Sequence, residues 1–142
     1  MQSEHFHNIR PSWVAFGWFI GAAVSAFLLF VFIFLGVLEQ DSTTGDVLWV
    51  GLSLLLGFAT GGFLAGVRTG AAPTLHGLLI GLFSLVVWLL ANLIPGEATG
   101  ATAWRETPIA QTLGMLVLLT VAAIVGARFG SRWTRRVPVD TV

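Results

Sequence analysis

Few side chains in this sequence could do chemistry, and His76 is the most conspicuous of them. It is the only ionisable residue inside the long apolar segments of a chain that is 56% hydrophobic and 10% charged. An ionisable group in such a segment is a candidate for proton transfer or ligand binding, and an imidazole can also ligate a pigment or haem iron. His76 stands one residue from the start of its segment, so we favour a structural or capping role. No second histidine lies at a comparable depth, so a bis-histidine haem within one chain is not expected.

Arginines form the second candidate group, and they are the only basic residues besides histidine because the chain has no lysine. Arg68 and Arg128 each follow an apolar segment, and Arg132 and Arg135 share a predicted helix face with Arg128. Such guanidinium groups either mark topology, with side chains that reach the headgroups, or hold an anionic lipid or a partner's carboxylate. We predict contact of Arg68, Arg128, Arg132 and Arg135 with anionic lipid or a partner. Nucleic acid is not an expected partner, since no accompanying domain is present.

Enzymatic chemistry is not expected of this chain. The stretch GGFLAGVRTGAAPTLHG, residues 61–77, lacks the Gly-Lys-Ser/Thr ending of a phosphate-binding loop. The apolar segments offer hydroxyl groups, His76 and Asn92 as polar side chains, and the chain has no cysteine, so neither a nucleophile with its base nor a metal cluster is indicated. The hydroxyl residues are too scattered to predict a channel lining with any force. They are Ser25, Ser53, Thr60, Ser84, Thr112 and Thr120.

Four apolar segments must position these residues. Each is long enough to span a hydrocarbon core of about 30 Å, which takes about 20 helical residues. We predict an all-α polytopic membrane protein with a transmembrane domain at 13–130, a tail at 1–12 and a basic tail at 131–142. Asp46 and Thr74 are expected to cap the second and third helices. The four helices are predicted at about 13–38, 47–67, 75–94 and 109–129.

The arginines also predict the orientation of the chain. Only Arg105 falls in a loop on one side, whereas the other six flank the opposite side. Cytoplasmic segments carry the excess of basic residues, so we expect both termini in the cytoplasm. The six are Arg10, Arg68, Arg128, Arg132, Arg135 and Arg136.

A weak internal repeat accompanies this topology. Shifting the sequence by 60 residues places "GWFIG" at 17–21 on "GLLIG" at 77–81, and it places "GVRTG" at 66–70 on "GARFG" at 126–130. Arg68 then matches Arg128. The pattern predicts two tandem helical hairpins in parallel orientation, related by a pseudo-two-fold axis along the membrane normal.

Small residues recur at four-residue spacing in every predicted helix. This pattern lets helix backbones approach closely in lipid, where no hydrophobic force drives helices together. We expect Asn92 to add an interhelical hydrogen bond. The glycines predicted to pack helices are Gly17, Gly21, Gly57, Gly61, Gly66, Gly77, Gly81, Gly126 and Gly130.

The central hairpin also resembles a family motif. Gly-Gly-x-x-Ala-Gly-x-Arg-x-Gly at 61–70, followed by His76-Gly77 and Gly81, is similar to the motif of small bacterial four-helix membrane proteins without an assigned activity. The resemblance implies a bacterial plasma membrane protein. We expect a non-catalytic accessory or scaffolding subunit that packs against larger partners or itself, with an oligomeric channel or small-solute transporter as the alternative. No cofactor is indicated beyond the minor alternative at His76.

Overall fold

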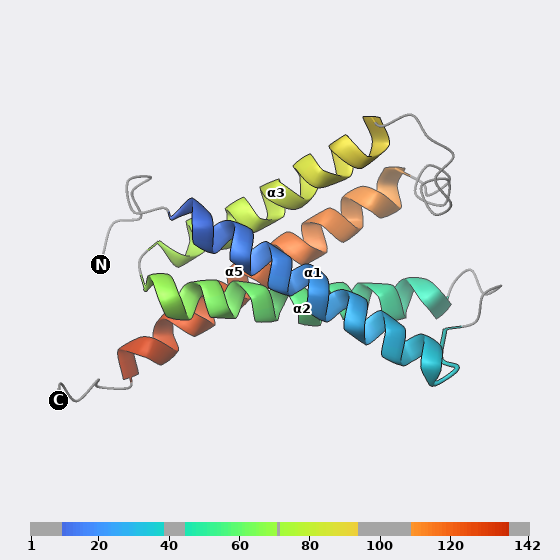
Figure 1. The fold of residues 1–142 in the computed structure, drawn as a ribbon, viewed down its shortest axis with the longest axis horizontal. Coiled ribbons are helices and arrows are strands. Elements are labelled where there is room, and N and C mark those ends of the chain that lie inside the picture. Colours follow the sequence, from blue (N-terminus) through green and yellow to red (C-terminus); the bar gives the residue numbers. More distant parts are fainter. Residues whose placement is uncertain (1–9, 39–44, 71, 94–108, 137–142) are drawn as a thin grey trace.

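The computed structural model describes residues 10–38, 45–70, 72–93 and 109–136, and all regular structure in these ranges is α-helical. Figure 1 shows the four helices: α1 (Pro11–Phe34), α2 (Gly45–Thr69), α3 (Pro73–Leu93) and α5 (Ile109–Arg136). Each of them is long and apolar enough to cross a membrane. The prediction of an all-α protein with four candidate membrane-spanning helices is therefore confirmed.

Two helices begin earlier than predicted because a proline occupies their first position. α1 starts at Pro11, after Arg10 in an extended conformation (φ −110°, ψ 100°), and α3 starts at Pro73. Proline suits this position because its φ is preset and the missing N–H would have no helical partner there. Thr74 and Asp46 consequently lie within the first turns of α3 and α2. The prediction that they precede these helices as caps is wrong.

Glycine in the left-handed region ends two of the helices. After α1, Gly36 has φ 68°, and its N–H donates to the carbonyl of Ile33 while the N–H of Val37 donates to that of Phe32, each at 3.0 Å. This is the Schellman arrangement, which pairs the last carbonyl groups of a helix. α1 therefore stops at Phe34, four residues before the predicted end. Gly70, with φ 58°, ends α2 in a related way.

α5 is longer than predicted. It continues to Arg136, so the predicted boundary between helix and tail at residue 131 lies about two turns too early. The added turns pack against the end of α2: Ser131 is buried, and the Thr134 hydroxyl donates to the carbonyl of Val67 at 3.1 Å.

The helices alternate in direction and pack unequally. α2 packs extensively against α1 and α5, and α5 packs against α3. α1 and α3 meet near their first turns, whereas the α1/α2 and α3/α5 pairs diverge toward the other end of the bundle (Figure 1). The start of α1 and the end of α5 therefore lie at the same end of the molecule, which is called the basic end below.

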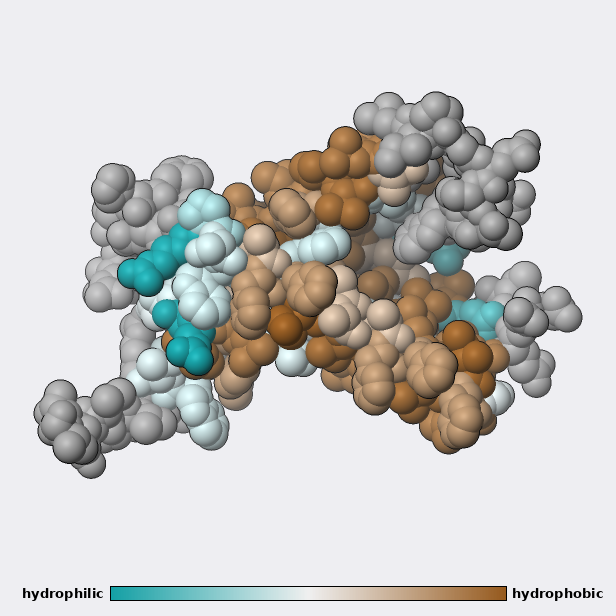
Figure 2. Space-filling model, in the orientation of Figure 1, coloured by the Kyte–Doolittle hydropathy of each residue, from teal (hydrophilic) through white to brown (hydrophobic). Residues whose placement is uncertain are grey.

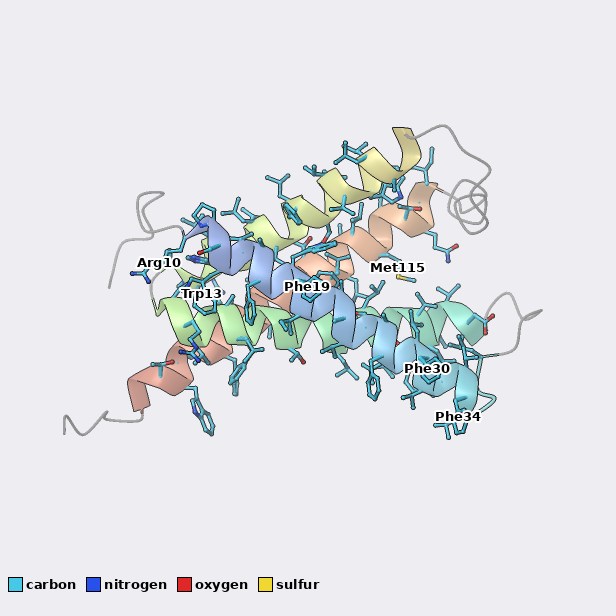
Figure 3. All side chains as sticks on the ribbon, in the orientation of Figure 1. Arg10, Trp13, Phe19, Phe30, Phe34 and Met115 are labelled. Atoms are coloured by element: carbon cyan, nitrogen blue, oxygen red, sulfur yellow. The ribbon has the colours of Figure 1, made fainter. Side chains whose placement is uncertain are left out.

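Apolar side chains cover most of the surface of the bundle. Figure 2 shows this surface, with hydrophilic residues gathered mainly at the basic end and a smaller group at the opposite end. Phe19, Phe30 and Phe34 of α1, labelled in Figure 3, are 65%, 66% and 81% exposed. Only 17% of the residues in the most apolar window of α1 are buried within the bundle. The interior is made instead of small residues with Phe58, Ile80 and Leu119.

Candidate functional site

His76 is buried at the basic end, between the first turns of α1 and α3. Its side chain is fully buried, and its Nε2 accepts a hydrogen bond from the backbone N–H of Arg10 at 3.3 Å. The other ring nitrogen, Nδ1, lies 3.0 Å from the carbonyl oxygen of Ala72. Because Nε2 accepts, the hydrogen-bond network assigns the proton of the neutral ring to Nδ1, which donates to Ala72. Both nitrogens are thus occupied by backbone groups.

The turn before α3 holds the ring in this position. Ala72 has φ 45°, an uncommon conformation for a residue with a side chain, and it is followed by Pro73. Its carbonyl accepts from the His76 backbone N–H at 3.2 Å as well as from the ring. His76 therefore connects the start of α1 to this turn. Ligation of a metal through Nε2 would require displacement of the Arg10 N–H.

The predicted arginines do not converge on one site. The Arg68 guanidinium lies over the ring of Trp13, with Cζ 5.9 Å from the ring centroid, a cation–π distance. Arg128 donates through Nε to the hydroxyl of Thr74 at 3.1 Å. Arg68 thus contacts α1, and Arg128 contacts α3. The Arg132 side chain is exposed, and that of Arg135 lies outside the described side chains.

Glycines carry the contact between α1 and α2. The ideal Cβ position at Gly61 meets the carbonyl oxygen of Gly17, and that at Gly57 meets the hydroxyl of Ser25. Gly21 stands against the ring and backbone of Phe58. Because no side chain separates these backbones, the Ser25 hydroxyl can donate to the carbonyl of Ser53 across the interface at 3.1 Å.

The α2/α5 contact is a parallel crossing of two glycine pairs. The Cβ positions of Gly62 and Gly66 meet the carbonyl oxygens of Ala123 and Ala127. Those of Gly126 and Gly130 meet the carbonyl oxygens of Ala59 and Phe63 in the same way. Each helix therefore presents a Gly-x-x-x-Gly pair to the backbone of the other, the spacing that permits close approach of membrane helices.

These contacts change the correspondence between the two halves. Gly62 and Gly126 are 64 residues apart, and so are their carbonyl partners Ala59 and Ala123. The ungapped shift of 60 residues is therefore one helical turn short for α2 and α5. In this contact Arg68 corresponds to Arg132, and the predicted match of Arg68 with Arg128 is wrong.

The second antiparallel pair, α3 and α5, also meets through glycines. The Cβ position of Gly77 lies 2.5 Å from Cα of Ile124, and that of Gly81 meets the Thr120 side chain. Gly77 and Gly81 are each 60 residues from Gly17 and Gly21, which hold the equivalent places in α1. All nine glycines predicted to pack helices thus lie at helix contacts.

Sequence reasoning missed two features of this interior. The first is Gly62, which is absent from the predicted packing glycines because Gly57 and Gly61 form another four-residue series in the same helix. The spacing of Gly62 to Gly66 nevertheless equals that of Gly126 to Gly130. The indole of Trp18 donates to the Ser84 hydroxyl at 3.0 Å and so joins α1 to α3. No sequence pattern indicated that pair. The predicted hydrogen bond of Asn92 concerns a side chain outside the described ones.

The fold and this interior define a class, an all-helical protein with four candidate membrane-spanning helices held together by backbone contact at glycines. No group of three or more metal-binding side chains occurs among the described residues. No protein-family model, curated protein or solved structure matches the chain.

Proposed function

We propose that this protein is a non-catalytic accessory or scaffolding subunit of the bacterial plasma membrane, which packs against other membrane helices or against a second copy of itself. Its two hairpins form a tandem pseudo-repeat, and both termini are cytoplasmic. The bacterial origin follows from the resemblance of residues 61–81 to small bacterial four-helix proteins. The gathering of arginines at the end where α1 starts and α5 ends supports the orientation.

The observation that carries this proposal is the exposure of α1. Only 17% of its most apolar window is buried, against 33% for α2. Phe19 and Phe27, each 65% exposed, point away from the bundle along with Phe30 and Phe34. Aromatic side chains bury a large area when they meet a partner, so this face suits a further membrane helix.

The hydrogen bonds already made by several polar side chains of the bundle support a non-catalytic role. Both ring nitrogens of His76 are engaged by backbone groups. The hydroxyls of Ser53, Thr60 and Thr120 each donate to a carbonyl one turn earlier in their own helix. These three hydroxyl donors are used within their own helices, so they give no support to the channel alternative.

Photo-crosslinking in cells tests the proposal. Benzoylphenylalanine in place of Phe27 should form a discrete crosslinked protein band, because the ring faces outward on α1. Benzoylphenylalanine in place of Phe58, only 4% exposed, is the matched control and should crosslink only within the chain. Native mass spectrometry after mild detergent extraction should then show the same partner, or a second copy, bound to the wild-type protein.

The opposite pattern would reject the proposal. A chain that crosslinks to no protein from Phe27 and stays monomeric in native mass spectra is not a subunit of an assembly. A homo-oligomer that conducts solute in liposomes would support the channel alternative instead.

A further inference from the structure

A groove runs along the lipid-facing side of the α2/α5 crossing. It has a volume of about 330 Å³ and its walls are largely apolar. Gly126 is among its lining residues, and the α2 backbone at Ala59 occupies its Cβ position, so the two helices meet closely at the base of the groove. The hydroxyl of Thr60 donates to the carbonyl of Leu56 at 2.8 Å, so this polar wall group is satisfied within its helix. The walls are formed by Leu56, Thr60, Phe63, Val125 and Phe129.

The groove points toward a positive charge at the basic end. Arg132 follows Phe129 by one helical turn and Val125 by two, so all three lie on the same side of α5. The Arg132 side chain is exposed and makes no hydrogen bond or ion pair within the described ranges. Trp133, 60% exposed, stands beside it. Arg132 is therefore available to a ligand that enters the groove from this end.

The charge of the surroundings favours an anion there. Among the described residues the acidic side chain is Asp46, in the first turn of α2 and so at the opposite end of the bundle. Arg68 and Arg128 add positive charge at the basic end, but they contact Trp13 and Thr74. An apolar groove that ends at the exposed guanidinium of Arg132 and an indole has the two parts that a phospholipid needs, a place for an acyl chain and one for its phosphate.

We propose that this groove binds an anionic phospholipid, with one acyl chain between α2 and α5 and its phosphate against Arg132. Guanidinium and phosphate match in geometry and charge, and the indole of Trp133 suits the interface between headgroup and hydrocarbon. The α2 wall from Leu56 to Phe63 covers about 10 Å along the helix axis, roughly a third of the hydrocarbon core. This site goes beyond the proposed scaffolding role and does not depend on it.

Native mass spectrometry of the full-length protein tests the site. The wild-type protein, equilibrated in detergent with equal amounts of phosphatidylglycerol and phosphatidylcholine, should retain mainly phosphatidylglycerol. Arg132→Gln should lower that retention about fivefold, which corresponds to about 1 kcal/mol for one basic residue near an anionic headgroup. Arg128→Gln is the matched control, because it removes the same charge from the face turned to α3, and it should change retention much less.

A second pair of variants tests the groove itself. Val125→Trp fills the groove and should reduce retention of both lipids. Leu82→Trp places the same side chain at a position of α3 that is 52% exposed and outside the groove walls, and it should have no effect.

Three results would each overturn the proposal. If Arg132→Gln and Arg128→Gln lose phosphatidylglycerol retention equally, the retention depends on the total charge at the basic end and not on a site at Arg132. Equal retention by Val125→Trp and Leu82→Trp would place the acyl chain elsewhere. Equal binding of the two lipids by the wild-type protein would remove the anionic specificity.

Discussion

His76 joins the start of α1 to the turn before α3, and it lies 66 residues after its partner Arg10. Its contribution comes from two hydrogen bonds between a fully buried ring and backbone groups. A buried donor that loses its acceptor costs about 1–3 kcal/mol. The ring is poorly placed to ligate a metal, because both of its nitrogens already make hydrogen bonds to backbone groups.

His76→Phe should therefore lower the free energy of unfolding by about 1–3 kcal/mol, since the ring is replaced by one of similar size that cannot accept from the Arg10 N–H. SDS-induced unfolding in mixed micelles, followed by tryptophan fluorescence, measures this. The loss should exceed that of Trp18→Phe, because Ser84 keeps its own hydrogen bond to Ile80 and an interhelical bond in lipid averages only about 0.6 kcal/mol. If His76→Phe is as stable as the wild-type protein, the hydrogen bonds of the His76 ring do not contribute to stability.

Gly70 and Gly114 both have no heavy atom within 4 Å of an added Cβ, but they differ in backbone conformation. Gly70→Ala should destabilise the protein by about 1 kcal/mol, because alanine is strained at φ 58°. Gly114→Ala lies in α5 and should stabilise it by up to about 1 kcal/mol, since alanine is the better helix former. The same SDS titration should show opposite signs for the two variants. Changes in stability of the same sign would mean that the space around each glycine, and not its φ angle, determines the effect of alanine.

At the scale of helices, stability rests on backbone contact between α2 and α5. Gly126→Ala places a methyl group against the carbonyl of Ala59, so the helices must separate, at a cost of about 1–3 kcal/mol for overpacking. Gly51→Ala is the matched control on the same interface, because its Cβ would meet Leu118 at 3.6 Å, an ordinary contact. Thermal unfolding of the two variants should differ clearly, with only Gly126→Ala losing stability. Equal melting temperatures would show that the crossing is not tight in the membrane.

The helices could be predicted from sequence to a large extent, and their ends only in part. Runs of about 20 apolar residues identify the spans through hydropathy alone. Their ends depend on particular backbone positions, such as Gly36 after α1, or on tertiary contact, as where Thr134 of α5 bonds to Val67. A hydropathy pattern carries no information about either.

In the candidate site, the sequence predicted only those residues whose type is unusual for their position. His76 stands out in an apolar segment, but its partner is the backbone N–H of Arg10, and a group that all residues except proline carry leaves no trace in the sequence. The glycine spacing indicated close packing without saying which carbonyl each glycine meets. The match of Arg68 with Arg128 failed for that reason, because the crossing point of α2 and α5 sets the correspondence at 64 residues.

For the whole molecule, the alternation of four helices brings the start of α1 and the end of α5 to the same end of the bundle, together with Arg10, Arg68, Arg128 and Arg132. α1 alone has 24 residues, which at about 1.5 Å per residue gives about 36 Å, enough to cross the hydrocarbon core. An excess of arginine retains a segment on the cytoplasmic side. The two ends of α1 should therefore face opposite compartments.

Single cysteines at the two ends of α1 test this directly, because the natural chain contains no cysteine. In intact cells an impermeant maleimide should label Val37→Cys, which follows α1 at the end opposite the basic end, and should leave Ser12→Cys unlabelled until the membrane is opened. Ser12 is exposed and Val37 is 37% exposed, so neither should be shielded by the bundle itself. Labelling of Ser12→Cys alone in intact cells would invert the orientation, and labelling of both would mean that α1 does not cross the membrane.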